Sequence, residues 1–409
     1  MEFINELRQV LTLSENIKTM AVQSLVSEAC FGMFYVVWQP YIIELEATIP
    51  QLGLVQGVMA LFAAVGSLLW GRLSDRVGRK PVYSASFVCR FIALVFCLTA
   101  RSWVSFIGFG IFMGFSATWM QSHPAAAALM TESVDEARVG TAISIYMSLG
   151  MMASIFTAPL GGYIALNRGY KLIFLSCLAG ELFNIAFISL RLRETLASES
   201  RSFRGQVSGL WKNLADFIRP ESSLIPFYVV SVLSSFSYRM SLSILYGLLV
   251  EVYGFNTVQL GLMSTTFGVA WGLSQIPLGW LMDRHGKKRF LLMSQTVSML
   301  AMVGYIASKS FIVFVAMEAL SGLGHAMWIP AYLTMVAERV PSEKRSSTLG
   351  KLSTLPQLFS IPAPYIGGVI YQALGFSAPM LIRLAILLLC LSIVSIFIDP
   401  RSNPASGKQ

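Results

Sequence analysis

The feature that most constrains this chain is a series of apolar stretches, each about as long as a membrane-spanning helix. A helix needs about 20 mainly apolar residues to cross the hydrocarbon core of a bilayer. Twelve such runs lie between breaks that carry Gly, Pro, Ser or charged residues. Their approximate limits are 19–44, 50–71, 81–100, 103–131, 139–165, 170–190, 223–252, 258–282, 288–308, 311–337, 346–373 and 377–398.

The composition also indicates a membrane protein. Of the 409 residues, 55% are hydrophobic and only 12% are charged, and the mean hydropathy is +0.65. A soluble globular domain carries about twice that charged fraction. The sequence therefore predicts an all-α membrane protein with twelve transmembrane helices.

The positions of Lys and Arg predict the orientation, because basic loops stay on the cytoplasmic side of a membrane. Most of the 30 basic residues fall in the termini and in alternate loops on one side. The exceptions in loops are Arg101, Arg168, Lys171 and Lys309. We therefore expect a multi-pass protein of the cell membrane with both termini cytoplasmic.

The net charge of +9 is spread over short loops between spans and does not form one extended basic face. Topology and contact with anionic lipid explain this charge better than a nucleic-acid partner does. No cleavable signal is expected after Met1-Glu2-Phe3, so the first span would act as its own insertion signal. The five cysteines lie in spans without metal-like spacing, and we expect no cofactor and a monomer.

The only long polar segment, 191–222, divides the chain into halves of six spans each, 1–190 and 223–409. Apolar residues recur in this segment at helical spacing, which predicts a helix on the cytoplasmic membrane surface. The helix would serve either as a strap between moving halves or as a simple interfacial anchor. These apolar residues are Val207, Leu210, Trp211, Leu214, Phe217 and Ile218.

The two halves repeat one another in order. GRLSDRVGRK at Gly71–Lys80 returns about 208 residues later as GWLMDRHGKKR at Gly279–Arg289. Such ordered matches indicate a duplicated six-helix unit. Further pairs are Gln51-Leu52-Gly53 with Gln259-Leu260-Gly261, Glu132 with Glu338, Arg138 with Arg345, and Pro159 to Gly162 with Pro364 to Gly368.

The pattern Gly-x-x-x-Asp-Arg-x-Gly-Arg-Lys at Gly71–Lys80 resembles the signature loop of the major facilitator superfamily. The resemblance extends to the span count, the duplication and the central polar segment. It implies two pseudo-symmetric six-helix bundles, with a substrate site between them near the middle of the bilayer.

The resemblance also implies that the charged loops latch the cytoplasmic side shut. We expect Asp75 to accept hydrogen bonds from the start of the eleventh span, at Ser346 to Thr348. Arg138 would be its charge partner, and Glu132 and Glu136 would complete the network. Alternatively, the basic residues only enforce topology. The latch residues are Gly71, Asp75, Arg76, Gly78, Arg79, Lys80 and Arg138, with Gly279, Asp283, Arg284, Gly286 and Arg345 in a weaker second copy.

Ionisable residues inside a bilayer are costly and mark candidate functional sites. The repeat places Glu28 close in depth to Arg239, where a desolvated Glu28 could exchange a proton but a close Arg239 would prevent this. Mutual neutralisation of acids and arginines is the alternative. The candidate substrate- or proton-binding residues are Glu28, Tyr35, Arg90, Glu181, Arg239, Glu318, His325 and Arg383, with His123 beside them.

Two further segments bear on mechanism. Glu318 to Gly322 and its counterpart Gly110 to Gly114 lack the arginine of the family's Arg-x-x-x-Gly pattern, for which Arg90 could substitute. Ala158-Pro159-Leu160-Gly161-Gly162 resembles a pattern of exchange-type members, which favours export, although helix kinking and close packing also explain it.

The sequence therefore predicts a secondary active transporter with a small-molecule substrate, a coupling proton and membrane lipid as partners. Proton-coupled export of amphipathic or drug-like compounds is the first hypothesis, supported by aromatic and Met residues along the candidate lining spans. The alternatives are uptake of a small organic anion held by Arg239, Arg90 or Arg383, and a nutrient sensor without transport. No nucleotide-phosphate loop or nucleophile-base arrangement indicates an enzyme.

Overall fold

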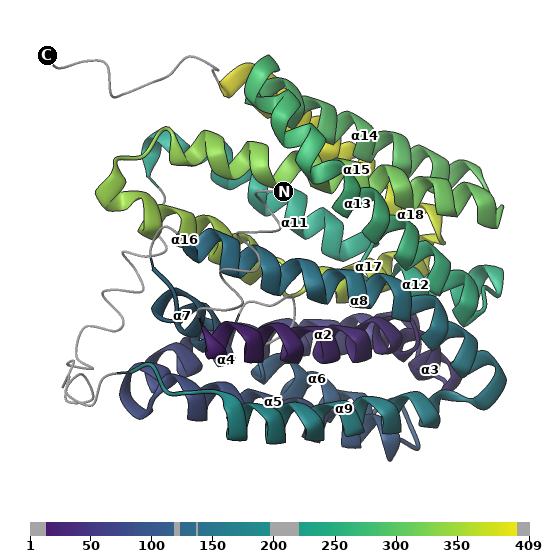
Figure 1. The fold of residues 1–409 in the computed structure, drawn as a ribbon. Helices are drawn as coiled ribbons and strands as arrows, with labels where there is room; N and C mark the ends of the chain where they lie inside the picture. Colours follow the sequence, from purple (N-terminus) through teal and green to yellow (C-terminus); the bar gives the residue numbers. More distant parts are fainter. Residues whose placement is uncertain (1–13, 118–122, 136–137, 197–220, 399–409) are drawn as a thin grey trace, which may run out of the picture. The chain divides into compact units, whose positions relative to one another are not determined.

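The computed structural model describes residues 14–117, 123–135, 138–196 and 221–398, and the regular structure in these segments is helical (Figure 1). Two compact units are formed by Met1–Gly205 with Phe255–Gly261, and by Gln206–Gly254 with Leu262–Gln409. Residues 197–220, which hold most of the predicted linker, lie outside the described segments. The surface helix expected there stays a prediction, as do the domain limits.

Unit 1 holds the helices of the first half of the chain. Helix α2 packs against α8 and α9, α5 packs against α9 and α6, and α4 packs against α6 (Figure 1). The bounds are α2 Glu15–Tyr35, α3 Trp38–Glu44, α4 Ile49–Val77, α5 Arg79–Leu98, α6 Ser105–Phe115, α7 Pro124–Glu132, α8 Val139–Arg168 and α9 Tyr170–Arg191.

Unit 2 holds most of the second half. Helix α14 packs against α15 and α18, and α11 packs against α16, α17 and α18. The bounds are η5 Ser222–Leu224, α11 Ile225–Ser241, α12 Leu245–Tyr253, α13 Thr257–His285, α14 Lys287–Ala307, α15 Phe311–Ala337, α16 Ser342–Phe359, α17 Ala363–Leu374 and α18 Ser377–Phe397.

Eight helical segments within the described residues are long and apolar enough to cross a membrane. The other four predicted spans are interrupted or less apolar. The span predicted at 103–131 contains α6 and α7, the span at 223–252 contains α11 and α12, and the span at 346–373 contains α16 and α17. The fourth is α13, which is continuous and has Pro277 inside it.

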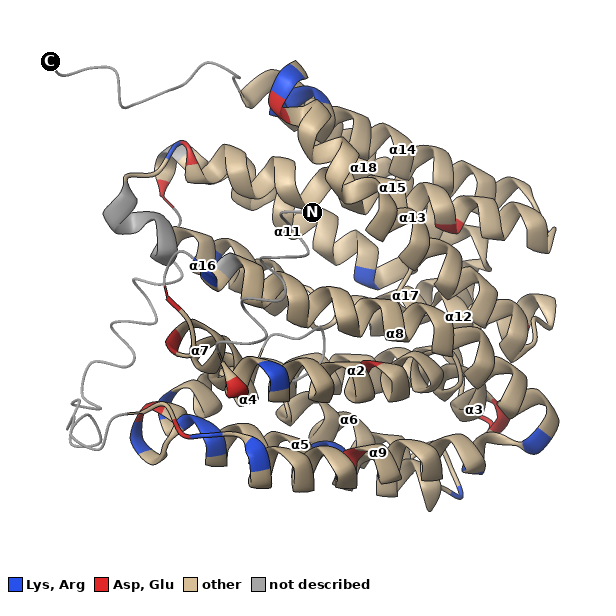
Figure 2. Cartoon of the chain, viewed as in Figure 1, with Lys and Arg blue, Asp and Glu red and all other residues tan. Residues whose placement is uncertain are grey.

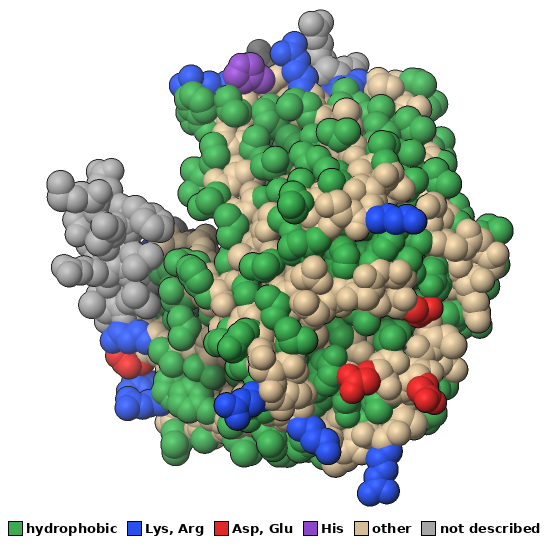
Figure 3. Space-filling model, turned by 90° about the vertical axis from the view of Figure 1, so that its right-hand side faces the viewer, with side chains coloured by type: hydrophobic (Ala, Val, Ile, Leu, Met, Phe, Trp, Pro, Cys, Tyr) green, Lys and Arg blue, Asp and Glu red, His purple; other side chains and the backbone are tan. Residues whose placement is uncertain are grey.

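Charged residues are concentrated at the ends of the helices, and few lie along their middles (Figure 2). Hydrophobic side chains cover much of the visible surface in the space-filling view (Figure 3). Phe156, Leu190 and Ile276, for example, are 73%, 84% and 85% exposed. Water-soluble proteins rarely expose large contiguous apolar areas, so this surface fits a lipid environment.

The contacts of the two halves repeat at the same offsets as their sequences. The backbone N–H of Thr48 donates to Gln51 Oε1 (2.8 Å), and that of Asn256 donates to Gln259 Oε1 (2.9 Å). Each glutamine thus satisfies a backbone donor at a helix start, as in a capping box. This shared cap explains why both copies of the repeat keep glutamine at this position.

Close helix packing also explains why glycine recurs at the same offset in the two halves. A Cβ on Gly114 would lie 2.2 Å from the carbonyl oxygen of Met59, and one on Gly322 would lie 2.6 Å from that of Phe267. Met59 and Phe267 are themselves 208 residues apart, as are the two glycines. The glycine of the Arg-x-x-x-Gly-like segment therefore permits close helix packing in both units, although the arginine is absent.

The Pro-Gly segments of the fifth and eleventh spans show the same behaviour. Gly161 approaches Met33 of α2, where an added Cβ would lie 2.5 Å from the Met33 Cα atom. Gly367 approaches Met240 of α11, with 1.8 Å to its carbonyl oxygen. Close packing is thus sufficient to explain these glycines, and their presence does not by itself indicate an exchange-type transporter.

Candidate functional site

A small polar pocket lies inside unit 1, among helices that are otherwise apolar. It spans about 260 Å³ of space not filled by atoms, part of which is open to solvent. Polar side chains from α2, α5 and α8 and the histidine before α7 meet there, so the pocket joins four segments that are distant in sequence. Its lining residues are Gln23, Ser27, Glu28, Tyr83, Phe87, Arg90, His123 and Tyr146.

Arg90 forms a buried ion pair at one side of this pocket. Its Nη2 atom lies 2.7 Å from Glu181 Oε1 of α9, and its Nη1 donates to Ser27 Oγ at 2.7 Å. The side chains of Arg90 and Glu181 are only 9% and 1% exposed. The structure thus shows for these two residues the mutual neutralisation that the sequence left open.

A hydroxyl chain lines another side of the pocket. The Tyr83 hydroxyl donates to Gln23 Oε1 at 2.6 Å, and it lies 3.4 Å from the hydroxyl of Tyr146. Ser24 donates to the Tyr146 carbonyl oxygen at 2.8 Å, which links α2 to α8. Hydrogen-bonded side chains of this type can order water or pass a proton between positions.

His123 lies before the first turn of α7 and is 2% exposed. Its ring packs 5.5 Å from the Tyr83 ring and 6.2 Å from the Trp70 ring, between centroids. Neither ring nitrogen has a hydrogen-bond partner among the described residues. His123 therefore adds a polar group of unused hydrogen-bonding capacity to the pocket.

The interior charges of unit 2 are arranged differently. Glu318 and Arg383 are 7% and 5% exposed, on α15 and α18. Within the described part of unit 2, neither forms an ion pair, whereas the acid Glu181 neutralises Arg90 in unit 1. Arg239, near the end of α11, is half-buried. Mutual neutralisation is therefore seen for Arg90 but not for Arg383 among the residues that the structure describes.

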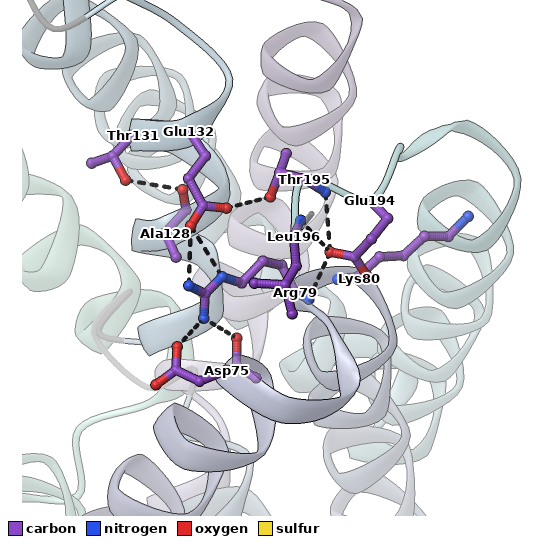
Figure 4. Close-up of polar contacts among 10 residues, drawn as sticks. Asp75, Arg79, Lys80, Ala128, Thr131, Glu132, Glu194, Thr195 and Leu196 are labelled. Carbon is purple, nitrogen blue, oxygen red and sulfur yellow. Dashed lines mark hydrogen bonds and ion pairs between the residues drawn. The ribbon is translucent and has the colours of Figure 1, made fainter. Parts of the chain in front are cut away.

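A separate network joins four segments at the charged loop of unit 1 (Figure 4). The Arg79 guanidinium bonds to Asp75 at the end of α4, to Ser74 Oγ (3.1 Å) and to Glu132 Oε1 of α7 (3.0 and 3.2 Å). Thr195, after α9, donates to the second oxygen of Glu132. Arg79 is only 14% exposed, which strengthens these contacts relative to surface ion pairs.

Glu194 caps the start of α5 in the same network. Its carboxylate accepts from the backbone N–H groups of Arg79 (2.8 Å) and Lys80 (3.2 Å), and from Thr195 and Leu196 (3.0 Å each). Partial burial alone would raise the pKa of Glu194, but these N–H donors stabilise the carboxylate and bring the pKa below its ordinary value. A negative charge at a helix N-terminus is also favoured by the helix dipole.

Gly78 has two reasons to be glycine. Its φ is +128°, a conformation that other residues rarely adopt, and a Cβ would lie 2.3 Å from Glu194 Oε2. At Gly71, by contrast, an added Cβ would lie 3.8 Å from Pro124, an ordinary contact. The positive φ therefore accounts for glycine at position 78, whereas packing does not require glycine at position 71.

The predicted charge partner of Asp75 also needs correction. We expected Arg138, but the structure pairs Asp75 with Arg79, four residues along the chain. The described side chains exclude Glu136, Ser346 and Ser347, so their parts in the expected network stay predictions. Arg76 is exposed, and Arg138 is half-buried beside the start of α8.

The second copy of the loop retains part of the network. Lys287 pairs with Glu338, which repeats the pairing of Arg79 with Glu132 at the equivalent positions. Lysine offers a point charge where arginine offers a fork, so this copy has fewer contacts.

The other residues of the second copy form fewer contacts. Arg284 stacks on the Trp280 ring at 3.7 Å, Asp283 is exposed, and Gly286 has a φ of +91°. A Cβ on Gly279 would meet nothing within 4 Å, and the Arg345 side chain lies outside the described set.

Several residues of these sites were missed by sequence reasoning. Gln23, Ser24 and Ser27 form a polar stripe with Glu28 along α2, and that spacing could have indicated the pocket. Tyr83 and Tyr146 gave no signal, because aromatic residues are common in spans.

Two acids outside the pocket were also missed. Glu194 and Glu221 lie next to predicted span ends, where an acidic residue is common and gives no signal in the sequence. Glu221 accepts from Tyr228 (2.6 Å), Thr348 (3.2 Å) and Lys351 (3.1 Å) in unit 2.

Of the predicted interior residues, the structure brings Glu28 to the same pocket as Arg90, and Arg90 to Glu181. Tyr35 is half-buried and packs on Phe31, with 5.7 Å between ring centroids. Arg239, Glu318, His325 and Arg383 belong to unit 2. Whether Glu28 faces Arg239 stays a prediction, because those two residues belong to different units.

Long apolar helices with exposed apolar side chains indicate a multi-pass membrane protein. The model of the Major Facilitator Superfamily matches residues 20–238 and 227–409, and the chain belongs to this superfamily. It is therefore a transporter for a small-molecule substrate and not an enzyme, with the all-α fold of two six-helix bundles that was predicted.

Known proteins support the same assignment. The chain is 25% identical over 335 residues to the multi-drug resistance efflux pump PmrA of Streptococcus pneumoniae, covering 80% of each chain. It is 21% identical over 341 residues to the multidrug resistance protein MdtG of Klebsiella pneumoniae, covering 82% of this chain and 81% of that one. Among solved structures, a bacterial homologue of the human lysosomal transporter Spinster, in an inward-facing and unoccupied conformation, matches with a TM-score of 0.75. Identity is 16%, over 95% of this chain and 97% of that one.

Proposed function

We propose that this transporter is a proton-coupled exporter of amphipathic or drug-like organic compounds in the cell membrane, with both termini cytoplasmic. The observation that carries the proposal is the polar pocket of unit 1, with Glu28 and Arg90 in its lining and Glu181 paired to Arg90. Intramembrane ionisable groups are retained chiefly where they handle ions, protons or substrate. Two relatives whose names describe multidrug resistance support the export direction.

The charge count of this cluster favours a proton or another cation as its ligand. It contains two carboxylates and one guanidinium, and the guanidinium already contacts Glu181 at 2.7 Å. The cluster becomes electrically neutral when one more positive charge enters it. A proton on a carboxyl, or a cationic group of a solute, would supply that charge, and Glu28 is the acid in the pocket lining that would receive it.

Proton coupling also requires a path along which protons reach the carboxyl, and the hydroxyl chain would provide it. Gln23, Tyr83 and Tyr146 are connected by contacts of 2.6 and 3.4 Å and line the same pocket as Glu28. His123 faces the same space with both ring nitrogens unpartnered in the described structure. These groups would order water in the pocket and hand protons to Glu28.

The network around Arg79 would serve as the cytoplasmic latch of the alternating-access cycle. It ties the ends of α4, α7 and α9 to the start of α5, so a movement of any one of these elements requires breaking charge-assisted bonds. The second copy, with Lys287 in place of the arginine, would hold less strongly.

Flux measurements in reconstituted vesicles test the proposal. Export should be driven by a pH gradient that is acid on the external side. Glu28→Gln removes a titratable carboxyl from the pocket and should flatten the dependence of transport on pH. Arg72→Gln, at an exposed position at the end of α4, is the control and should keep the wild-type profile. A preserved pH profile in Glu28→Gln would refute the assignment of that residue.

A second candidate is proton-coupled uptake of a small organic anion, and one observation favours it. Arg383 is buried in unit 2 and has no acidic partner within the described residues. The same vesicles separate the two functions: accumulation of an anion along the inward proton gradient supports uptake, whereas extrusion against it supports export.

A further inference from the structure

The membrane-embedded arginines of the two units differ in how their charge is balanced. Arg90 of unit 1 contacts the Glu181 carboxylate at 2.7 Å. Arg383 of unit 2 is 5% exposed, and its Nε and Nη1 atoms have no hydrogen-bond partner in the described part of the chain. Burying a guanidinium without a counter-charge is expensive. A position that carries this cost without an internal partner is one where an external anion would be bound strongly.

The ring of Tyr238 lies against the buried guanidinium. Its carbon atom Cζ lies 5.1 Å from the centre of the Tyr238 ring of α11. The Tyr238 ring meets the His325 ring of α15 edge to face, with 5.3 Å between centroids. A ring face offsets part of the positive charge but accepts no strong hydrogen bond from it. The Nε and Nη1 donors of Arg383 therefore lack an oxygen acceptor in the described structure.

The aromatic cluster continues away from Arg383 across unit 2. His325 contacts Phe267 of α13 at 5.3 Å, and Phe267 contacts Trp271 at 6.0 Å. The His325 Nδ1–H donates to the Ser321 carbonyl oxygen at 3.0 Å, which fixes the ring orientation. Trp271 Nε1 is a second donor without a partner in the described structure. The cluster thus combines ring surfaces with unsatisfied donors and, at Arg383, a fixed positive charge.

We propose that Arg383 and the aromatic cluster formed by Tyr238, Phe267, Trp271 and His325 bind the anionic group and the ring of an aromatic organic anion. This inference rests on the proposed function, because a transported solute must reach positions inside the bundle. A carboxylate would accept charge-assisted hydrogen bonds from the Arg383 guanidinium, whose Nε and Nη1 donors have no partner in the described structure. The ring of the solute would pack against the aromatic side chains.

Binding to the purified full chain in detergent tests this inference without any need for transport. The probes are 1-naphthoate, the neutral 1-naphthylmethanol and the cationic 1-naphthylmethylammonium, measured by thermal stabilisation and by calorimetric titration. Naphthoate should raise the unfolding temperature more than the other two. Arg383→Met should weaken naphthoate binding by about 10- to 100-fold, as expected for the loss of charge-assisted hydrogen bonds. Arg383→Lys should give an intermediate affinity, because it keeps the charge but not the fork.

Stability without ligand separates a binding role from a structural one. Arg383→Met removes a buried charge without an acidic partner, so its unfolding temperature should equal or exceed that of the wild type. Arg90→Met is the matched comparison, and its unfolding temperature should fall because Glu181 loses its partner. If Arg383→Met unfolds at a temperature as low as Arg90→Met, or fails to fold, Arg383 is structural and the proposal is overturned.

An anionic lipid headgroup has chemistry similar to that of the solute, so a separate control experiment must distinguish the two ligands. Phosphatidylglycerol added to the detergent should not displace naphthoate. Stabilisation by phosphatidylglycerol alone that depends on Arg383 would overturn the solute assignment, as would equal binding of the three naphthyl probes to the wild type. If naphthoate does not bind but other compounds still show proton-driven flux, the proposed anion site is refuted and the proposed coupling is not. Intact binding without proton-driven flux refutes the proposed coupling alone.

Discussion

At the scale of single residues, burial decides which charges hold the fold and which are available for function. Arg90 and Glu181 are each less than a tenth exposed and lie 2.7 Å apart, so they stabilise one another inside the bundle. Breaking such a pair leaves an uncompensated charge, whereas replacing both members removes the cost. This asymmetry gives a direct test of the pair.

Arg90→Met should lower the free energy of unfolding by about 3–5 kcal/mol, because it leaves the Glu181 carboxylate buried and alone. The double variant Arg90→Met with Glu181→Met should recover most of that loss. Thermal unfolding in detergent, monitored by circular dichroism, measures both. A double variant no more stable than the single one would show that the pair is not an isolated unit.

Glu194 provides a pH-dependent test at the same scale. Its pKa is lowered in the folded protein, so its stabilising effect is present above the ordinary carboxyl pKa of about 4.3 and is lost as pH falls through the folded value. Glu194→Gln should therefore cost about 0.3–1 kcal/mol at neutral pH, as expected for a charge at a helix N-terminus.

The cost of Glu194→Gln should disappear in acid, when the wild-type carboxyl is protonated too. Unfolding curves of both proteins, measured between neutral pH and about pH 3, give the comparison. Glu44→Gln, at a carboxyl distant from α5 in sequence, is the control for general acid effects. A difference between Glu194→Gln and wild type that stays constant with pH would contradict the cap.

At the scale of helices, close backbone contacts explain the glycines that both halves share. Gly114 and Gly322 lie where a Cβ would collide with the carbonyl oxygen of Met59 or Phe267. Backbone atoms cannot move aside as flexible side chains do. The same glycines belong to segments in which the family's arginine is absent, so their retention reflects packing of α4 on α6 and of α13 on α15.

Gly114→Ala and Gly322→Ala should each cost about 1–3 kcal/mol, because overpacking forces helices apart. Gly279→Ala is the internal control: a Cβ at Gly279 meets nothing within 4 Å, and alanine in a helix is favoured over glycine by about 0.5–1 kcal/mol. Chemical denaturation of the three purified variants measures the order of stability. A loss for Gly279→Ala equal to that for Gly114→Ala would contradict the packing account.

How far the elements could be predicted depends on the signal that each leaves in the sequence. Hydropathy located the twelve stretches, and the repeat located Gly78 and Gly286, because a positive φ demands glycine in both copies. Hydropathy could not show that the first and seventh spans break near Val36 and Ile244, since these breaks contain apolar residues. The partners of Arg79 and Arg90 depend on side-chain geometry between distant segments, so Glu194 and Ser27 were missed.

At the scale of the whole molecule, the two repeated units differ in the charge of their interiors. Unit 1 has Glu28, Arg90 and Glu181 along its spans, and unit 2 has Arg239, Glu318 and Arg383. Ionising all of them gives unit 1 a net negative interior and unit 2 a net positive one. The duplication therefore preserved packing while the chemistry of the two interiors diverged, which suits a transporter that handles a proton and a solute on different surfaces.

The predicted topology places both charged loops on the cytoplasmic side, because basic loops remain there. Single cysteines introduced at Arg76 and Arg284 in a cysteine-free background should react with an impermeant maleimide only in inside-out vesicles. Cysteines at Arg101 and Lys309 should react only in right-side-out vesicles. Labelling of the first two positions from opposite faces would contradict both the orientation and the duplicated architecture.

The latch predicts a kinetic effect without a binding effect. Asp75→Asn weakens the contact with Arg79 while leaving the pocket of unit 1 unchanged, so turnover should fall and substrate affinity should stay close to that of the wild type. Flux and ligand-induced thermal stabilisation of the same preparation separate the two quantities. Unchanged flux would refute a role of Asp75 in the transport cycle.

We propose that the proton bound in the pocket that contains Glu28 is exchanged for solute during transport. The most direct measurement is substrate-evoked proton movement in vesicles that contain the purified protein and a pH-sensitive dye. Adding a transported compound to wild-type vesicles should change the internal pH, and Glu28→Gln vesicles should transport without that change or not at all. Solute flux through the wild-type protein with no accompanying proton movement would contradict the account.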